Sequence, residues 1–519
     1  MGKILPPIII NRFDGGISDD PRQPIANMGA MVKHFNIFDN PFKLTPYRST
    51  EADTATNVSS TDAKTYDIRN FQLGSNGQLY GLGKNANGYP KVLKKTDPTT
   101  GNWLSSNGGN AATAEGEGTA ARIVGCFIEW QSAFWFFQGT DVFKVLISNG
   151  VASDQGNIGA TPTTVAQGIV GADNNLYLPY NNKLVRVNSS GTVTDDVSPA
   201  IPSDMRITSV TRYTGGYLAI GCAYGTSATA TPAGRSQVFI WDMVSTTFSD
   251  VVDWGEGALM CLGNVEGRVV GITDKYITSA LGLTRGSMVV RMWAGGIPQV
   301  VKEIVTNQTV STTTQARILN EVVIKNNKMY WVASVPFNQS TTTQSTHHLG
   351  IWVFGRKNNN SNFTISLDYI EEGIDTSNFF IRSFGAAGDY WFINHSADGS
   401  ITKTDDTANY TFTSIYESQI FNLGDNSILK KIIGITVNTA PMPTAGQVVL
   451  KYRKDEETSY TTIFTHTTDN SLTHSAVNIE SSGATLPTFR ELQLRIESVG
   501  GAEIVAYSFK CEEVGTKLY

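Results

Sequence analysis

The feature that most constrains the fold is a strand-and-turn pattern that recurs from about residue 66 to residue 405. Its clearest copy is residues 169–188, where Leu176 and Leu178 alternate with Tyr177 between two turns rich in Asn. Period-two alternation bounded by Asn and Gly turns is typical of β-hairpins. Comparable turns lie near residues 76, 131, 174, 215, 266, 326 and 388. About seven units, spaced by roughly 40 to 60 residues and holding several strands each, predict a β-propeller.

The longer spacings coincide with polar tracts rich in Thr, Ser, Asn and Gly. These tracts are residues 96–118, 226–235 and 338–348. Long polar segments between strands are typical of surface loops. We therefore expect them to be loops at the rim of the propeller.

The pattern changes after about residue 410, where six longer alternating runs follow. They are residues 411–421, 428–437, 447–453, 460–466, 489–497 and 503–511. Six alternating strands in one such stretch predict a β-sandwich. No long window has a helical period, so the whole chain is expected to be all-β.

An irregular segment precedes the repeats, at residues 11–48. Large apolar residues stand there among Gly, Pro, Asn and Asp, a composition that offers few local hydrogen bonds. Such a segment must lie against something already folded. It is either a strap over the chain's own core or a strap that also touches a neighbouring subunit. The candidate strap or subunit-interface residues are Phe13, Gly15, Gly16, Ile17, Phe35, Ile37, Phe38, Tyr47 and Arg48. The predicted domains are thus residues 1–65, 66–410 and 411–519.

Composition excludes several function classes. Charged residues make up 17% of the chain and the net charge is −6, without any basic block, which argues against external binding of nucleic acid. The spacing of Cys126, Cys222, Cys261 and Cys511 matches no zinc or CxxC pattern, so buried thiols are expected. No run of eighteen apolar residues occurs, so no membrane span is expected.

Catalytic motifs are also missing. His347 and His348 lie in a polar loop outside any HExxH pattern, and solvated loop residues are the simpler interpretation. The aromatic run 134–137 could form a sugar platform, but a strand buried on both faces fits it better. Paired carboxylates could serve glycoside hydrolysis if they met in a cleft, although adjacent acids in polar loops are usually exposed turns. The pairs are Asp19–Asp20, Asp195–Asp196, Glu371–Glu372 and Asp405–Asp406. The sequence therefore predicts no catalytic, cofactor or metal site, and the protein is not expected to be an enzyme.

Both ends of the chain resemble one family of proteins. At the start stand Phe13-Asp-Gly-Gly-Ile-Ser-Asp-Asp-Pro-Arg, Phe35-Asn-Ile-Phe and Lys43-Leu-Thr-Pro-Tyr-Arg. Near the end stand Tyr416-Glu-Ser-Gln-Ile-Phe-Asn-Leu-Gly-Asp and Lys430-Lys-Ile-Ile-Gly-Ile. These motifs are similar to those of bacteriophage virion tail proteins, in particular the nozzle or hub (tail tubular protein B-like) proteins of short-tailed phages. One departure is that Pro46 precedes Tyr47-Arg48, whereas the family places proline after the arginine.

The resemblance implies a structural role in the phage tail and no enzymatic residue. It implies a homo-oligomeric ring, expected to be a hexamer, that conducts genomic DNA through its lumen without sequence-specific binding. It also implies docking of an adaptor and of fibres or spikes. Two alternatives remain open at the level of sequence: a propeller-based adhesin that binds glycans, and a glycoside hydrolase of the phage tail. Deleting residues 1–48 is expected to leave some β-structure and to abolish assembly.

Overall fold

The predicted hairpins are present in the computed structural model. It describes residues 3–18, 22, 27–53, 67–84, 90–95, 97, 103–105, 124–225, 234–278, 284–309, 318–333, 349–357, 361–370, 381–394, 401–405, 410–467, 475–477 and 488–514. Within these ranges the chain forms strands and a single short 3-10 helix, η1 (Thr214–Gly216). The expectation of an all-β protein is therefore confirmed.

The chain divides into two compact units that are discontinuous in sequence. One comprises residues 1–49, 351–372 and 405–519, and the other comprises residues 50–350 and 373–404. These units differ from the predicted ranges 1–65, 66–410 and 411–519 in two respects. The first 49 residues belong with the C-terminal strands, and so does a segment from the middle of the chain.

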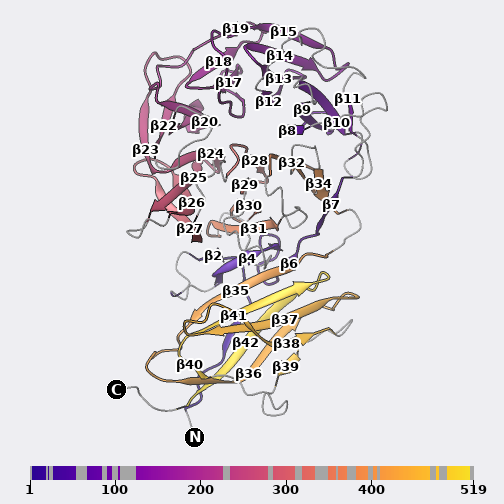
Figure 1. Cartoon of the computed structure of the whole chain (residues 1–519), viewed down its shortest axis with the longest axis vertical. Helices are drawn as coiled ribbons and strands as arrows, with labels where there is room; N and C mark the ends of the chain where they lie inside the picture. Colours follow the sequence, from indigo (N-terminus) through magenta and orange to yellow (C-terminus); the bar gives the residue numbers. More distant parts are fainter. Residues whose placement is uncertain are drawn as a thin grey trace. The chain divides into compact units, whose positions relative to one another are not determined.

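The larger unit is a β-propeller, with small antiparallel sheets arranged around a common centre (Figure 1). The first two sheets are β8 (Asp67–Leu73), β9 (Leu79–Lys84), β10 (Pro90–Lys95), β11 (Trp103–Ser105), and β12 (Val124–Trp130), β13 (Ala133–Gln138), β14 (Asp141–Leu146), β15 (Ala152–Asn157). The third and fourth are β16 (Ile169–Val170), β17 (Leu176–Tyr180), β18 (Lys183–Val187), β19 (Val193–Thr194), and β20 (Met205–Arg212), β21 (Leu218–Tyr224), β22 (Arg235–Trp241), β23 (Asp250–Glu256).

Three further groups of strands complete this unit. The fifth sheet is β24 (Ala258–Val265), β25 (Arg268–Thr278), β26 (Thr284–Trp293) and β27 (Gln299–Thr309). A hairpin of β28 (Val323–Lys325) and β29 (Lys328–Ala333) follows. The last sheet is β32 (Ser383–Ala387), β33 (Tyr390–Asn394), β34 (Ile401–Thr404) and β7 (Thr50–Ala52). Each predicted turn falls between the first two strands of one of these seven groups, so the propeller is confirmed.

Residues 50–53, which precede the first sheet of the propeller in sequence, close the propeller ring. Strand β7 pairs antiparallel with β34, with Thr402 opposite Ala52. Just beyond β7, the Asp53 carboxylate accepts hydrogen bonds from Lys95 Nζ at 2.9 Å and from Trp103 Nε1 at 2.9 Å. Lys95 and Trp103 belong to the first sheet. One short segment therefore joins the last sheet to the first.

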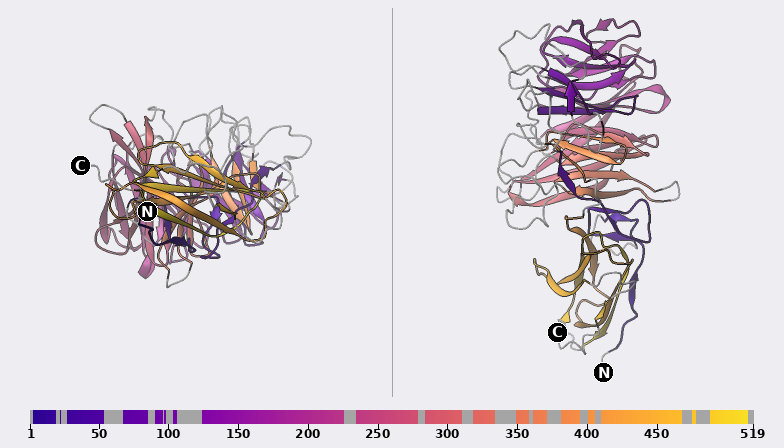
Figure 2. Two further views of the ribbon diagram at one scale, coloured as in Figure 1. Left: turned by 90° about the horizontal axis from the view of Figure 1, so that it is seen from below. Right: turned by 90° about the vertical axis from the view of Figure 1, so that its right-hand side faces the viewer.

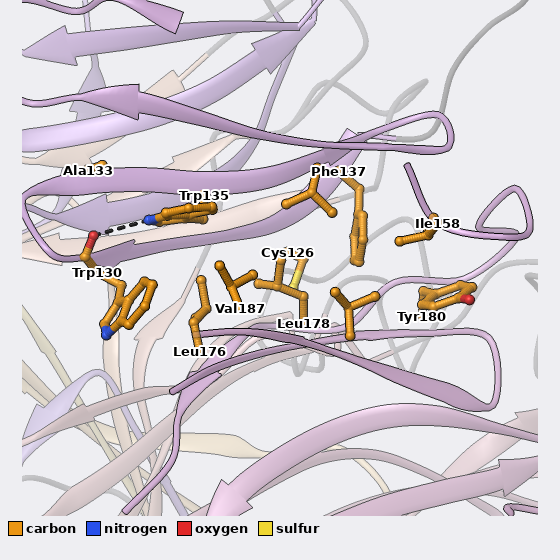
Figure 3. Packing of buried hydrophobic residues seen from close by; sticks show 12 residues of the cluster. Cys126, Trp130, Ala133, Trp135, Phe137, Ile158, Leu176, Leu178, Tyr180 and Val187 are labelled. Atoms are coloured by element: carbon orange, nitrogen blue, oxygen red, sulfur yellow. Dashed lines mark hydrogen bonds between the residues drawn. The ribbon is translucent and has the colours of Figure 1, made fainter. Parts of the chain in front are cut away.

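Apolar side chains fill the space between neighbouring sheets. Figure 3 shows one such cluster, where Trp135 and Phe137 of the second sheet face Leu176 and Leu178 of the third. Trp135 Nε1 donates to the backbone oxygen of Trp130 at 3.1 Å, so the indole is buried with its polar atom paired. The four residues Phe134 to Phe137 are all buried, which confirms a strand covered on both faces rather than a sugar platform.

The predicted loop over residues 96–118 is wrong in part. Trp103–Ser105 forms β11, which pairs with β10, and the Trp103 side chain is almost fully buried. The tryptophan supplies the apolar anchor, while the surrounding Thr, Gly and Asn residues conceal the strand in the sequence. Most of the tracts 226–235 and 338–348 lies outside the described residues.

The smaller unit is a β-sandwich of two sheets. One contains β1 (Ile8–Ile10), β42 (Ile504–Glu513), β36 (Lys430–Thr439), β39 (Ser475–Val477) and β40 (Thr488–Phe489). The other contains, in this order, β30 (Gly350–Gly355), β31 (Thr364–Ile370), β4 (Met31–Lys33), β35 (Ser414–Phe421), β41 (Leu492–Val499), β37 (Gln447–Lys454) and β38 (Thr461–His466). Phe421 and Phe509 meet between the sheets with ring centroids 4.9 Å apart. All six predicted C-terminal strands are present.

The N-terminal segment is woven into this sandwich. Figure 2 shows β1, in indigo, beside the yellow C-terminal strands, and β1 pairs with β42. Strand β4 lies between β31 and β35. Short pairs connect the remainder: β2 (Gly16–Ile17) with β3 (Met28–Gly29), and β5 (Phe35–Asn36) with β6 (Thr45–Pro46). The N-terminal segment thus lies against strands of the chain's own sandwich unit.

Candidate functional site: one face of the propeller and its axial pocket

A pocket lies where three inner strands of the propeller end. These are β8, β28 and β32, the first strand of their respective groups. Its volume is about 390 Å³, within the usual range of small-molecule sites. It is lined by Phe71, Gln72, Leu73, Gln167, Val322, Val323, Ile324, Lys325, Gly385, Ala386 and Gly388. The pocket is therefore mainly apolar, with few polar groups.

Two of these polar groups have spare hydrogen-bond donors. Lys325 Nζ donates to the Gly388 oxygen at 2.5 Å and lies 3.8 Å from an Asp389 oxygen. An ammonium carries three N–H groups, so further donors are available. Gln167 Oε1 accepts the Val322 N–H at 3.4 Å, which leaves the Gln167 amide NH₂ without an acceptor among the described residues.

One carboxylate close to the pocket, that of Glu321, is already engaged by hydrogen bonds. Glu321 Oε1 accepts from Asn70 Nδ2 at 2.5 Å, and its second oxygen accepts from the Phe384 N–H at 3.3 Å. These bonds tie the residue two positions before β28 to β8 and β32. Among the side chains that line the pocket, Lys325 is the one that carries a charge.

The pocket opens at the end of the propeller where, in each sheet, one turn joins the first strand to the second and another joins the third strand to the fourth. In an antiparallel sheet these connections leave at one end, and the second-to-third connections leave at the other. We call the former end the short-turn face. Seven large aliphatic side chains of the propeller unit are exposed among the described residues, and all of them lie on or next to connections of this face. They are Leu73, Val151, Val244, Val251, Ile297, Val300 and Ile324.

The most exposed members stand at hairpin tips. Val244, between β22 and β23, is 84% exposed, and Ile297, between β26 and β27, is 86% exposed. Gly295 and Gly296 precede Ile297 with positive φ values of 111° and 73°, which shape a projecting turn. The two hairpins belong to successive sheets.

The nine residues predicted from sequence lie elsewhere, in the sandwich unit. Phe13, Ile17, Phe35, Ile37 and Phe38 are buried. Phe13 packs between the two sheets, with its ring centroid 5.3 Å from that of Tyr416 and 6.5 Å from that of Tyr507. These side chains stabilise their own subunit, which leaves their assignment to a subunit interface a prediction.

The other four predicted residues have distinct roles. A Cβ on Gly16 would meet the Ile365 oxygen at 2.7 Å, and its φ of 66° is itself unfavourable for other residues. Gly15 is crowded by Asn27 in the same way. The Tyr47 hydroxyl donates to Asp368 at 2.7 Å. Arg48 is exposed, whereas Gly15 and Tyr47 are partly buried.

The carboxylate pair Asp195–Asp196 serves turns. Asp195 accepts from the Tyr180 hydroxyl at 2.7 Å and from the Gly159 N–H at 3.0 Å, while Asp196 pairs with Lys183 at 2.8 Å. Burial raises the pKa of the Tyr180 hydroxyl, and its bond to Asp195 adds to the effect. The pairs Asp19–Asp20, Glu371–Glu372 and Asp405–Asp406 lie wholly or partly outside the described residues, as do His347 and His348.

The described parts of the chain also contain thiols and other side chains that could bind a metal ion. All four cysteines are buried and free, and burial raises the pKa of the Cys222 and Cys261 thiols. No group of three or more potential metal ligands comes together in the ranges given above. Within the same ranges no helix has the length and apolarity needed to cross a membrane.

Comparison with known proteins gives matches among solved structures only. No protein family and no curated protein matches the sequence. Among solved structures, a streptogramin B lyase matches with a TM-score of 0.42 and 11% identity, over 69% of this chain and 97% of that one. The WD40 domain of Neurospora crassa Pan2 matches with a TM-score of 0.40 and 8% identity, over 70% of this chain and 96% of that one. Both are at identities too low to carry an activity across.

The site differs from the sequence-based expectation because it is assembled from distant strand ends. Its lining residues span positions 71 to 388, and each taken alone is an ordinary strand residue. One local signal was present. The run Gly295-Gly296-Ile297-Pro298 places a large aliphatic residue in a turn, where polar residues are usual.

Proposed function

We propose that this chain is a structural component of a phage virion, a tail nozzle or hub that assembles with further copies of itself and docks other tail proteins. The single observation that carries this proposal is the group of exposed aliphatic residues on the short-turn face, above all Val244 and Ile297 at hairpin tips of successive sheets. Scattered exposed aliphatic residues are ordinary, but residues gathered on one face favour a contact with another protein. In this proposal, the propeller provides the surface through which the subunit binds other subunits or tail proteins.

Two sequence features support the virion assignment. Motifs at both ends of the chain resemble those of phage tail nozzle and hub proteins. The net charge of −6 suits a passage for DNA, because phosphate binding depends on Lys and Arg. The implied localisation is the phage tail, with a lumen that DNA crosses without specific contacts.

The assembly is tested by native mass spectrometry and by electron microscopy of the purified protein. We expect a closed ring, a hexamer in the proposed form. The double variant Val244→Ser/Ile297→Ser should shift the population towards monomers, because it removes two projecting aliphatic contacts. A matched control is Ile9→Ser/Val505→Ser, which changes two exposed aliphatic residues of the sandwich unit. A wild-type protein that stays monomeric, alone and with the other proteins of its virion, would contradict the proposal.

The glycan-binding and hydrolase alternatives are tested in parallel. Release of reducing sugar from host polysaccharide, lost on replacing a paired aspartate, would favour the hydrolase. Retention of the protein on host glycan without turnover would favour the adhesin. Recovery of this chain with adaptor and fibre proteins from purified virions would favour the nozzle or hub.

A further inference from the structure

The axial pocket has a donor-rich chemistry that assembly does not explain. Its lining includes the Lys325 ammonium and the Gln167 amide NH₂ as spare donors, and Lys325 is its one charged side chain. The Gln72 amide, whose N–H donates to the Leu73 oxygen, adds a neutral acceptor. Such a site favours a ligand that brings acceptor oxygens. Because one donor is a cation, an anionic oxygen would gain most from it.

The side chains that line the pocket indicate the chemistry of the remainder of the ligand. Leu73, Val322, Val323, Ile324 and Ala386 give aliphatic surface, and Phe71 contributes one aromatic ring. Leu73 is 41% exposed and Ile324 is 47% exposed, so apolar surface at the mouth remains open to water. A ligand with an aliphatic body would cover it.

We propose that this pocket binds an aliphatic carboxylate, with the carboxylate at Lys325 and Gln167 and the hydrocarbon against the aliphatic wall. Two carboxylates of the chain bear on this charge assignment. Asp389 has an oxygen 3.8 Å from Lys325 Nζ, and its side chain is fully exposed. Because water screens an exposed ion pair, Asp389 competes only weakly for the ammonium. One oxygen of Glu321 accepts from Asn70 and the other accepts from the Phe384 N–H. Because both oxygens are bonded in this way, Glu321 is not expected to compete for Lys325.

The first test compares ligands with similar hydrocarbon chains and head groups of opposite charge. Full-length protein is titrated with hexanoate and with hexylamine at low salt, using isothermal titration calorimetry. Hexanoate should bind, and hexylamine should bind at least about tenfold more weakly because the ammonium of Lys325 repels it. Equal binding of both compounds, or no binding of hexanoate, would overturn the proposal.

The second test uses variants with opposite expected effects. Lys325→Met keeps the length of the side chain but removes its charge, and should weaken hexanoate binding about tenfold. Asp389→Asn removes the competing carboxylate and should tighten binding by about twofold to threefold. The matched control is Lys328→Met, because Lys328 lies opposite Lys325 in the same hairpin without lining the pocket. Thermal unfolding of each variant checks that the fold is kept. Loss of binding in the control equal to that in Lys325→Met would overturn the assignment.

A carboxylate with an aliphatic body can be a free short-chain acid or the end of a polypeptide. The peptide acetyl-Gly-Gly-Leu with a free carboxylate is therefore compared with hexanoate and with its own amide. Tighter binding of the peptide acid indicates a chain end, and tighter binding of hexanoate indicates a small molecule. Equal affinity of peptide acid and peptide amide would contradict a carboxylate-binding site for the peptide.

Discussion

At the scale of single residues, His34 is the most unusual side chain of the sandwich unit. It is completely buried, with φ at 59°, and neither ring nitrogen has a hydrogen-bond partner among the described residues. Its ring lies 5.6 Å from Phe412, 5.8 Å from Tyr369 and 6.1 Å from Tyr47, measured between centroids. Burial lowers the pKa of His34 to about 4, although backbone groups of Asp368 and Tyr47 partly offset it. The neutral form is therefore the one that the fold accommodates.

The first prediction concerns pH. The folded pKa of His34 lies below the unfolded value of 6.5, so the unfolded state binds more protons between pH 6.5 and 4. Stability from this residue should be complete above pH 7 and should fall by about 3 kcal/mol as pH decreases to 4. Urea unfolding at several pH values measures the free energy of unfolding and its dependence on pH. His34→Asn, which tolerates positive φ, should flatten this part of the profile. Identical profiles for wild type and His34→Asn would contradict this prediction.

The second prediction concerns the buried ion pair that closes the propeller. The side chains of Lys95 and Asp53 are 0% and 1% exposed, and the Lys95 ammonium also lies 5.6 Å from the ring centroids of Trp103 and Phe392. Asp53→Asn leaves a buried ammonium without its counter-charge and should cost about 3 to 5 kcal/mol. The double variant Asp53→Asn/Lys95→Met should recover part of this loss. Chemical denaturation followed by tryptophan fluorescence measures both, and equal stability of Asp53→Asn and wild type would disprove the assignment.

At the scale of elements, pairings between neighbours in sequence were predictable and distant pairings were not. The hairpin turns near residues 76 and 388 follow from alternation and from Asn and Gly, all of which are local. The pairing of β7 with β34 joins residues some 350 positions apart. The insertion of β4 between β31 and β35 likewise involves three separated segments. No local pattern records such partners, so the two units and the axial pocket emerged only from the structure.

The third prediction follows from the woven N-terminal segment. Deleting residues 1–48 removes β1 and β4 as well as Phe13, which packs between the sheets of the sandwich. The sandwich unit should therefore lose its fold, while the propeller retains β7 and Asp53. Limited proteolysis with mass spectrometry would show rapid cleavage after residue 410 and protection of residues 124–225. Protection of the C-terminal strands in the truncated protein would contradict a structural role for this segment.

At the scale of the whole molecule, the short-turn face exposes aliphatic residues and carries charges of both signs. Asp242 and Asp250 are acidic, and Lys325 and Lys328 are basic. An interface built on this face should depend little on long-range electrostatics. We predict that the proposed oligomer persists when salt rises from about 0.05 M to about 0.5 M, since screening acts on charges and leaves apolar contacts intact. Sedimentation velocity across this range measures the population of each species. Dissociation at high salt would instead indicate that ion pairs join the subunits, and would shift attention from Val244 and Ile297 to charged residues such as Arg48.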